Sequence, residues 1–157
     1  MRLGRALGRG LAAGAAGTTA LDAVTYLDMA VHGRPASSTP EDTVEILTAK
    51  LRLAVPGDDD TRKNRLVGLG ALTGIIAGLG VGATLGLVTT VGLRPNLVVA
   101  GIVTGAGAMA LSDGLMTVLG VTDPRTWTAK DWRSDAVPHL AYGLVTAAVV
   151  QALDRRG

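Results

Sequence analysis

Three ionisable side chains lie well inside segments that are mostly apolar. Asp22, Asp113 and His139 are each flanked by runs of Ala, Gly, Val and Leu. In a membrane such groups face a bundle interior or a wet cavity, because lipid offers them no hydrogen bond. They can bind and release protons, or they can join helices as hydrogen-bond donors and acceptors.

Helical spacing extends these three residues into polar faces. Residues separated by three, four or seven positions share one side of an α-helix. The sets are Thr18, Asp22 and Thr25; Asp113 and Thr117; and His139 and Tyr142. If the three faces converge, they form either a proton or substrate path or a set of hydrogen bonds that holds the helices together. For a chain this small we prefer the second interpretation, and the first stays open.

Other site chemistries find no support in the residues. The chain has no cysteine, and its two histidines cannot build the usual zinc site. No serine sits in a nucleophile elbow, and no glycine-rich loop follows a strand. We therefore expect no catalytic residue, no metal site and no cofactor, and we predict that the protein is not an enzyme.

The elements that position the polar groups are predicted to be membrane helices. Leu66 to Leu93 is 28 residues long without an ionisable side chain. As a helix it reaches about 42 Å, more than the roughly 30 Å of bilayer hydrocarbon. We predict further spans at 11–31, 97–121 and 136–153, the last capped by Ser134 or Asp135. The fold class is thus an all-α membrane bundle of four helices in one domain, 1–157.

The connection after the first span is predicted to contain an amphipathic helix at 40–54, with Thr39 as its N-cap. Val44, Leu47 and Leu51 form one apolar stripe along it. Such a helix lies on the membrane surface or caps the bundle. The residues at 57–65 then read as a solvated linker.

Glycine spacing indicates how the helices associate. In lipid, helices associate by close packing, and a row of glycines lets a second backbone approach. Glycine recurs every fourth residue along the long span, and twice in the next span: Gly70, Gly74, Gly78, Gly82, Gly86, Gly101 and Gly105. The pattern predicts a partner helix in a homo-oligomer or in a larger membrane complex.

Composition and flanking residues agree with a lipid bilayer as the environment. Hydrophobic residues make up 48% of the chain and the mean hydropathy is +0.37. Trp127 and Trp132 suit a membrane interface. The net charge of +2 comes with arginines beside apolar segments, so we expect contact with lipid headgroups and not with nucleic acid.

The charge bias leaves the orientation open. Arg2, Arg5 and Arg9 favour a cytoplasmic N-terminus. The first and third connections carry nine basic residues against six on the other side, which favours the reverse.

The two halves of the chain contain a possible repeat. AGTTALDAVTYL (16–27) resembles AGAMALSDGLMTVL (106–119), with the aspartate one residue later in the second copy. Two helices per copy would give a parallel repeat about an axis along the membrane normal. Chance similarity of Ala/Gly-rich sequence is the alternative.

This layout resembles a known family. Four short helices, an Asp in the first, a Pro-containing polar connection and HLAYG (139–143) at the start of the last helix are similar to the YagU-like small inner-membrane proteins, of actinobacterial type. The resemblance implies a multi-pass inner-membrane protein and carries no assigned chemistry. The first connection lacks the Pro-Pro pair expected there.

Two functions follow as expectations. The first is a non-catalytic accessory or scaffold protein that docks another helix through its glycines. The second is a small proton-coupled carrier or channel that uses the intramembrane Asp and His residues.

Overall fold

The computed structural model describes residues 3–93 and 95–155 of the chain. Arg2, Arg94 and Arg156, which enter the charge comparison above, lie outside the described residues. Within the described ranges the chain is all-α, with five α-helices, two short 3-10 helices and no strand. The helices are α1 Leu3–His32, α2 Thr39–Lys50, α3 Asp59–Val88, η1 Thr89–Val91, α4 Leu97–Leu119, η2 Pro124–Thr126 and α5 Ala129–Arg155.

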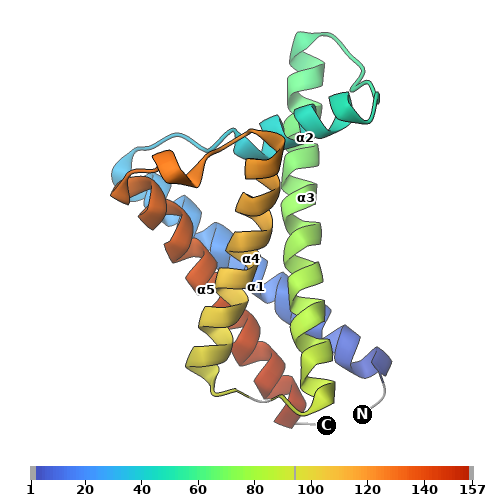
Figure 1. Cartoon of the computed structure of the whole chain (residues 1–157), viewed down its shortest axis with the longest axis vertical. Helices are drawn as coiled ribbons and strands as arrows, with labels where there is room; N and C mark the ends of the chain where they lie inside the picture. Colours follow the sequence, from blue (N-terminus) through green and yellow to red (C-terminus); the bar gives the residue numbers. More distant parts are fainter. Residues whose placement is uncertain (1–2, 94, 156–157) are drawn as a thin grey trace.

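The long helices pack in the order α3, α1, α5, α4. Helix α1 runs along both α3 and α5, and α5 runs along both α1 and α4. Helices α3 and α4 follow one another in the chain but make few contacts with each other. Figure 1 shows the start of α1 and the end of α5 at the same end of the bundle, with the α1–α3 and α4–α5 connections at the other.

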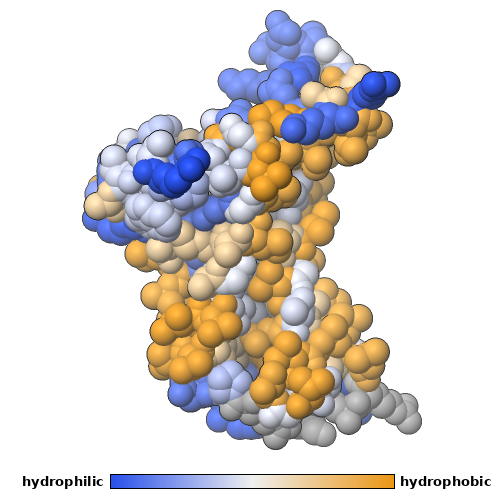
Figure 2. Space-filling view, viewed as in Figure 1, coloured by the Kyte–Doolittle hydropathy of each residue, from blue (hydrophilic) through white to orange (hydrophobic). Residues whose placement is uncertain are grey.

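Three of these helices are long and apolar enough to cross a membrane. By length and composition they are Asp59–Val91, Leu97–Leu119 and Ala129–Arg155. Their outer faces expose aliphatic side chains, among them Leu72, Ile76 and Val103. Figure 2 shows the resulting apolar band, with hydrophilic residues at the α2 end and around η2. These features suggest a membrane protein. Helix α1 is long but is not one of the three.

Helix α3 begins seven residues before the predicted span, because Asp58 caps it. The Asp58 side chain accepts a hydrogen bond from the backbone N–H of Thr61 at 2.9 Å. This bond satisfies one of the free N–H groups of the first turn. The prediction of a solvated linker at 57–65 is therefore wrong for residues 59–65, which are helical. At its other end the α-helix stops at Val88, and η1 replaces the last predicted turn.

Helix α5 also begins earlier than predicted. Thr128 and Asp131 cap one another: the N–H and the hydroxyl of Thr128 donate to Asp131 Oδ2, and the N–H of Asp131 donates to Thr128 Oγ1. This is the capping-box arrangement. The predicted cap at Ser134 or Asp135 is wrong, and both residues lie inside the helix. Pro138 is likewise inside the helix and is buried.

Helices α1, α2 and α4 each differ from their predicted ranges chiefly at one end. Helix α1 is helical from Leu3 on, eight residues before the predicted span. Helix α2 ends at Lys50 and not at 54, because Arg52 takes a left-handed conformation with φ of 56°. Helix α4 ends at Leu119, followed by Gly120 with φ of 78°. The N-cap of α2 is Ser38, one residue before the predicted Thr39.

Helix α2 packs against the first half of α3. Val44 is buried there, whereas Leu47 and Leu51 of the predicted stripe are exposed. Arg62 on α3 donates to Glu45 on α2 at 2.7 Å. Helix α2 therefore lies against α3, and it also contacts α4.

Candidate functional site

Four polar side chains meet between α4 and α5, and we call them the α4–α5 polar cluster: Ser112, Asp113, Asp135 and His139. His139 Nδ1 lies 2.9 Å from the backbone oxygen of Asp135 and 3.4 Å from its carboxylate Oδ1. The carboxyl groups of Asp113 and Asp135 act on one another electrostatically, and Asp113 also feels the charge of His139. Two of the predicted site residues, Asp113 and His139, are thus brought together.

The hydrogen bonds of the cluster define where protons can reside. A backbone carbonyl only accepts, so His139 Nδ1 carries the proton toward Asp135. Ser112 Oγ donates to the backbone oxygens of its own helix at 3.2 and 3.0 Å and lies 3.5 Å from His139 Nε2. With its proton on Nδ1, a neutral His139 presents Nε2 as an acceptor to the Ser112 hydroxyl. Asp135 Oδ2 is buried and has no hydrogen-bond partner among the described residues.

This arrangement can hold an exchangeable proton. Two carboxylates that act on one another electrostatically repel, and a proton shared between them relieves the repulsion. An imidazole beside the pair can take or give that proton in the neutral pH range. The cluster lies near the ends of the two helices, since Asp113 precedes the end of α4 by six residues and Asp135 follows the start of α5 by six.

A second polar group lies where α1, α3 and α5 meet. The hydroxyl of Tyr142 donates to the backbone oxygen of Gly78 at 2.6 Å, and the Thr18 hydroxyl donates to Gly14 at 2.9 Å within its own helix. Tyr142 and Thr146 are almost fully buried. Because these hydroxyls bond helix backbone, Tyr142 and Thr18 act here as packing groups.

Three predicted site residues join neither group. Among the described residues, no hydrogen bond or ion pair connects Asp22 with Asp113 or His139. Asp22 and Thr25 are half-buried on α1, and Thr117 is exposed on α4. The carboxyl group that Asp113 meets is that of Asp135.

Sequence reasoning missed Asp135 and Ser112 as members of the site. A cap at Ser134 or Asp135, as predicted, would place Asp135 outside the polar face of the last helix. Its signal was present, since Asp135 and His139 are four residues apart and four residues make one helical turn. Ser112 carried no signal of its own beyond its place next to Asp113.

The predicted packing glycines lie at three different contacts. A Cβ atom on Gly78 would meet the Thr18 side chain of α1, and one on Gly86 would lie 2.5 Å from the backbone oxygen of Ala6. A Cβ on Gly70 would lie 3.0 Å from Pro40 of α2. Gly82 packs on α1, and Gly101 and Gly105 pack on α5.

Gly74 differs from the rest of the row. A Cβ on Gly74 would meet nothing within 4 Å, so this glycine is open on the outer face of α3. Four of the five glycines in the α3 row are therefore covered within the chain, and one is not.

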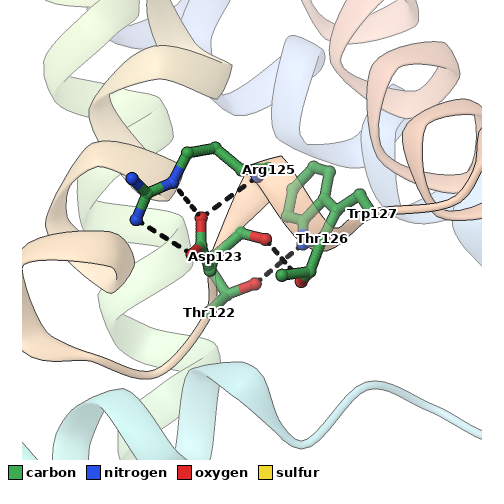
Figure 3. Close-up of polar contacts among 5 residues, drawn as sticks. All are labelled: Thr122, Asp123, Arg125, Thr126 and Trp127. Carbon is green, nitrogen blue, oxygen red and sulfur yellow. Dashed lines mark hydrogen bonds and ion pairs between the residues drawn. The ribbon is translucent and has the colours of Figure 1, made fainter.

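The two tryptophans lie side by side after η2. The ring centroids of Trp127 and Trp132 are 5.1 Å apart in an edge-to-face arrangement. Trp127 Nε1 donates to the Thr122 hydroxyl at 2.9 Å (Figure 3). The turn before them thus holds one indole in place, at the polar end of the bundle.

Asp123 organises that turn. Its carboxylate accepts from Arg125 Nε at 2.9 Å, from Arg125 Nη2 at 3.0 Å and from the Arg125 backbone N–H at 3.1 Å (Figure 3). These bonds, those from the guanidinium first, hold the pKa of Asp123 below its ordinary value. The carboxylate is therefore charged throughout the physiological range.

No metal centre is found among the described residues, where no group of three or more His, Asp or Glu side chains could hold an ion. Comparison of the chain with family models, with curated proteins and with solved structures gives no match. The resemblance to the YagU-like group stays a prediction from sequence.

Proposed function

We propose that the chain is an integral protein of the plasma membrane with four spans, in which α1 is the fourth. Helix α1 has 30 residues, which reach about 45 Å as a helix. It packs lengthwise on two of the candidate spans, α3 and α5. The start of α1 and the end of α5 lie at one end of the bundle, as an even number of spans requires (Figure 1). The half-buried position of Asp22 supports a first span that depends on its neighbours.

Its function is that of a non-catalytic accessory or scaffold subunit that binds another membrane helix. The observation that carries this proposal concerns the glycines spaced four residues apart along α3. Gly74 has no neighbouring atom within 4 Å of a Cβ placed on it, whereas the other four glycines pack against α1 or α2. A glycine that faces lipid gains nothing from lipid, but it lets a second backbone come close. The partner helix belongs to a foreign subunit or to a second copy of this chain.

The test is a pair of substitutions on one helix. Gly74→Leu should leave the thermal stability of the purified protein unchanged and abolish co-purification of the partner or the oligomer. Gly78→Leu should lower the thermal stability, because the new side chain would collide with Thr18. Particle composition and melting temperature in detergent measure both effects. An unchanged particle for Gly74→Leu would contradict the proposal.

A second candidate function is proton exchange for a small carrier or channel, favoured by the α4–α5 polar cluster. The cluster combines two carboxyl groups that act on one another electrostatically, an adjacent imidazole and a buried carboxylate oxygen of Asp135. A proton held between the two carboxyl groups would satisfy that oxygen.

Asparagine and leucine at position 113 separate this function from simple packing. If the cluster only joins helices, Asp113→Asn keeps the stability and Asp113→Leu lowers it by about 1 to 3 kcal/mol. If the cluster exchanges protons, Asp113→Asn also abolishes pH-driven flux in reconstituted vesicles. Equal tolerance of both substitutions in stability and flux would exclude both roles for Asp113.

A further inference from the structure

The contact between α1 and α3 is built from backbone at glycines of both helices. A Cβ atom on Gly82 would lie 2.5 Å from the backbone oxygen of Gly10 and 2.5 Å from Gly14 Cα. A Cβ on Gly14 would lie 2.6 Å from the backbone oxygen of Gly78 and 3.0 Å from Leu79 Cα. Only glycine fits at such a crossing.

The contact between α4 and α5 brings equivalent backbone atoms together in the same sequence order. A Cβ on Gly143 would meet the backbone oxygen of Gly101 and lie 2.8 Å from Gly105 Cα. A Cβ on Gly105 would lie 2.5 Å from the backbone oxygen of His139 and 3.3 Å from Leu140 Cα. Each α4 residue is 91 positions after its α1 counterpart, and each α5 residue is 61 positions after its α3 counterpart. The α4–α5 hairpin therefore corresponds to the α1–α3 hairpin, and Asp113 corresponds to Asp22.

The two hairpins meet at a closed seam between α1 and α5. Gly17 of α1 is so close to α5 that a Cβ there would collide with the side chains of Tyr142 and Thr146. At one end of the seam Arg9 forms an ion pair with Asp154 at 3.1 Å, with both side chains mostly buried.

The same offsets pair α1 with α4 and α5 with α3. The α1–α5 seam therefore has an equivalent seam between α4 and α3. In it the ion-paired Arg9 and Asp154 are replaced by Ala100 and Leu93. The buried Thr146 is replaced by Leu85. The α3–α4 seam thus has aliphatic residues where the α1–α5 seam has an ion pair. Helices α3 and α4 also make few contacts with each other.

A cavity of about 260 Å³ lies at this place. Its lining includes the three replacements Leu85, Leu93 and Ala100, together with Ala147 and Val150 of α5. Its polar lining residues are Thr89, Gln151, Asp154 and Arg155. Gln151 and Arg155 belong to the last turns of α5. The apolar part of the cavity is therefore bordered by polar and charged groups at the end of the bundle where α1 begins.

We propose that the chain consists of two copies of one helical hairpin and that the open seam between α3 and α4 binds an acyl chain of a membrane phospholipid. The aliphatic walls suit a hydrocarbon chain, and Arg155 at the rim suits the phosphate of its headgroup. A helix with its side chains is about 10 to 12 Å wide, too large for a space of this volume between two helices joined by a short connection. The site requires that α3, α4 and α5 lie in a bilayer, and it depends on neither function proposed above.

Native mass spectrometry of the full chain, released from detergent, tests the site. The probe is dioleoyl phosphatidylglycerol, added in parallel with free oleate. We expect one retained phospholipid per wild-type chain. Leu85→Trp fills the cavity and should weaken retention about tenfold, a loss of about 1.4 kcal/mol in binding free energy. The matched control Leu72→Trp lies on the same helix, 54% exposed and outside the cavity, and should retain the lipid.

A second variant covers the case in which Leu85→Trp does not fold. Leu93 is 61% exposed at the rim, so Leu93→Trp has room for its ring and should also reduce retention. The proposal is overturned if the wild type retains no phospholipid, or if the cavity variants and Leu72→Trp retain it equally. Retention of oleate without phospholipid would assign the site to a free fatty acid, and a two-copy particle lost in Leu85→Trp would assign it to a second chain. Either result overturns the proposal.

Discussion

The carboxylate of Asp123 shows how single residues order the polar end of the bundle. It accepts three hydrogen bonds from Arg125, and this turn also positions Trp127 beside Trp132. The residue lies outside the apolar helices, so its titration can be followed in water. Its charge therefore reports whether the turn is intact.

We expect the Asp123 carboxyl to titrate below 3.8, its ordinary pKa. Because the folded pKa is lowered, the charged turn contributes stability above pH 3.8, and this contribution is lost as the pH falls through the folded pKa. Arg125→Gln should return the pKa toward the ordinary value. The carboxyl carbon chemical shift of Asp123 measures the pKa. An unchanged titration in Arg125→Gln would contradict the geometry of the turn.

At the scale of residues, the sequence predicted which polar residues belong to the site better than it predicted which residues they contact. The apolar surroundings of Asp113 and His139 marked both as unusual, and they do lie in one cluster. The partner of Asp113 was not predictable, because Asp22 and Asp135 were both available and only the packing of α4 on α5 selects Asp135. Thr117 has the helical spacing of a partner but lies on the exposed side of α4.

At the scale of elements, the glycine crossings determine which helices pack. Gly82→Ala should lower the free energy of unfolding by about 1 to 3 kcal/mol, since a methyl group would collide with the backbone of α1. Gly143→Ala should act in the same direction at the α4–α5 crossing. Gly80→Ala on the same helix as Gly82 meets nothing within 4 Å and should be neutral or slightly stabilising. Thermal unfolding in detergent measures all three, and equal effects at Gly80 and Gly82 would contradict the crossing.

The apolar stretches predicted the existence of the long helices but not their ends. Hydropathy indicates which residues suit a lipid environment. The length of a helix depends instead on its backbone hydrogen bonds and on the caps at its ends. Asp58 and Thr128 therefore extend α3 and α5 well beyond their apolar parts. The glycine row predicted close packing, and its partner turned out to lie mostly within the chain, a choice that spacing alone cannot make.

At the scale of the whole molecule, the packing order predicts the topology in the membrane. The chain has no cysteine, so single cysteines can be introduced as reporters. With four spans, Ser37→Cys and Thr126→Cys should react with an impermeant maleimide from one side of sealed vesicles. Arg5→Cys and Arg155→Cys should react from the other side. Labelling of positions 5 and 37 from the same side would show that α1 does not cross the bilayer.

The position of α1 between α3 and α5 also affects how the protein is made. About 100 residues separate the end of α1 from the start of α5, which takes on the order of 5 to 20 seconds to synthesise. During that time α1 lacks the helix that covers Gly17 and pairs with Arg9. On the proposed four-span topology, Asp22 near a bilayer centre would cost about 2.5 to 3.5 kcal/mol, so α1 would be stably inserted only once α5 has been made. On that topology, a chain that stops before α5 would lose α1 from the bilayer and become a substrate for membrane proteases.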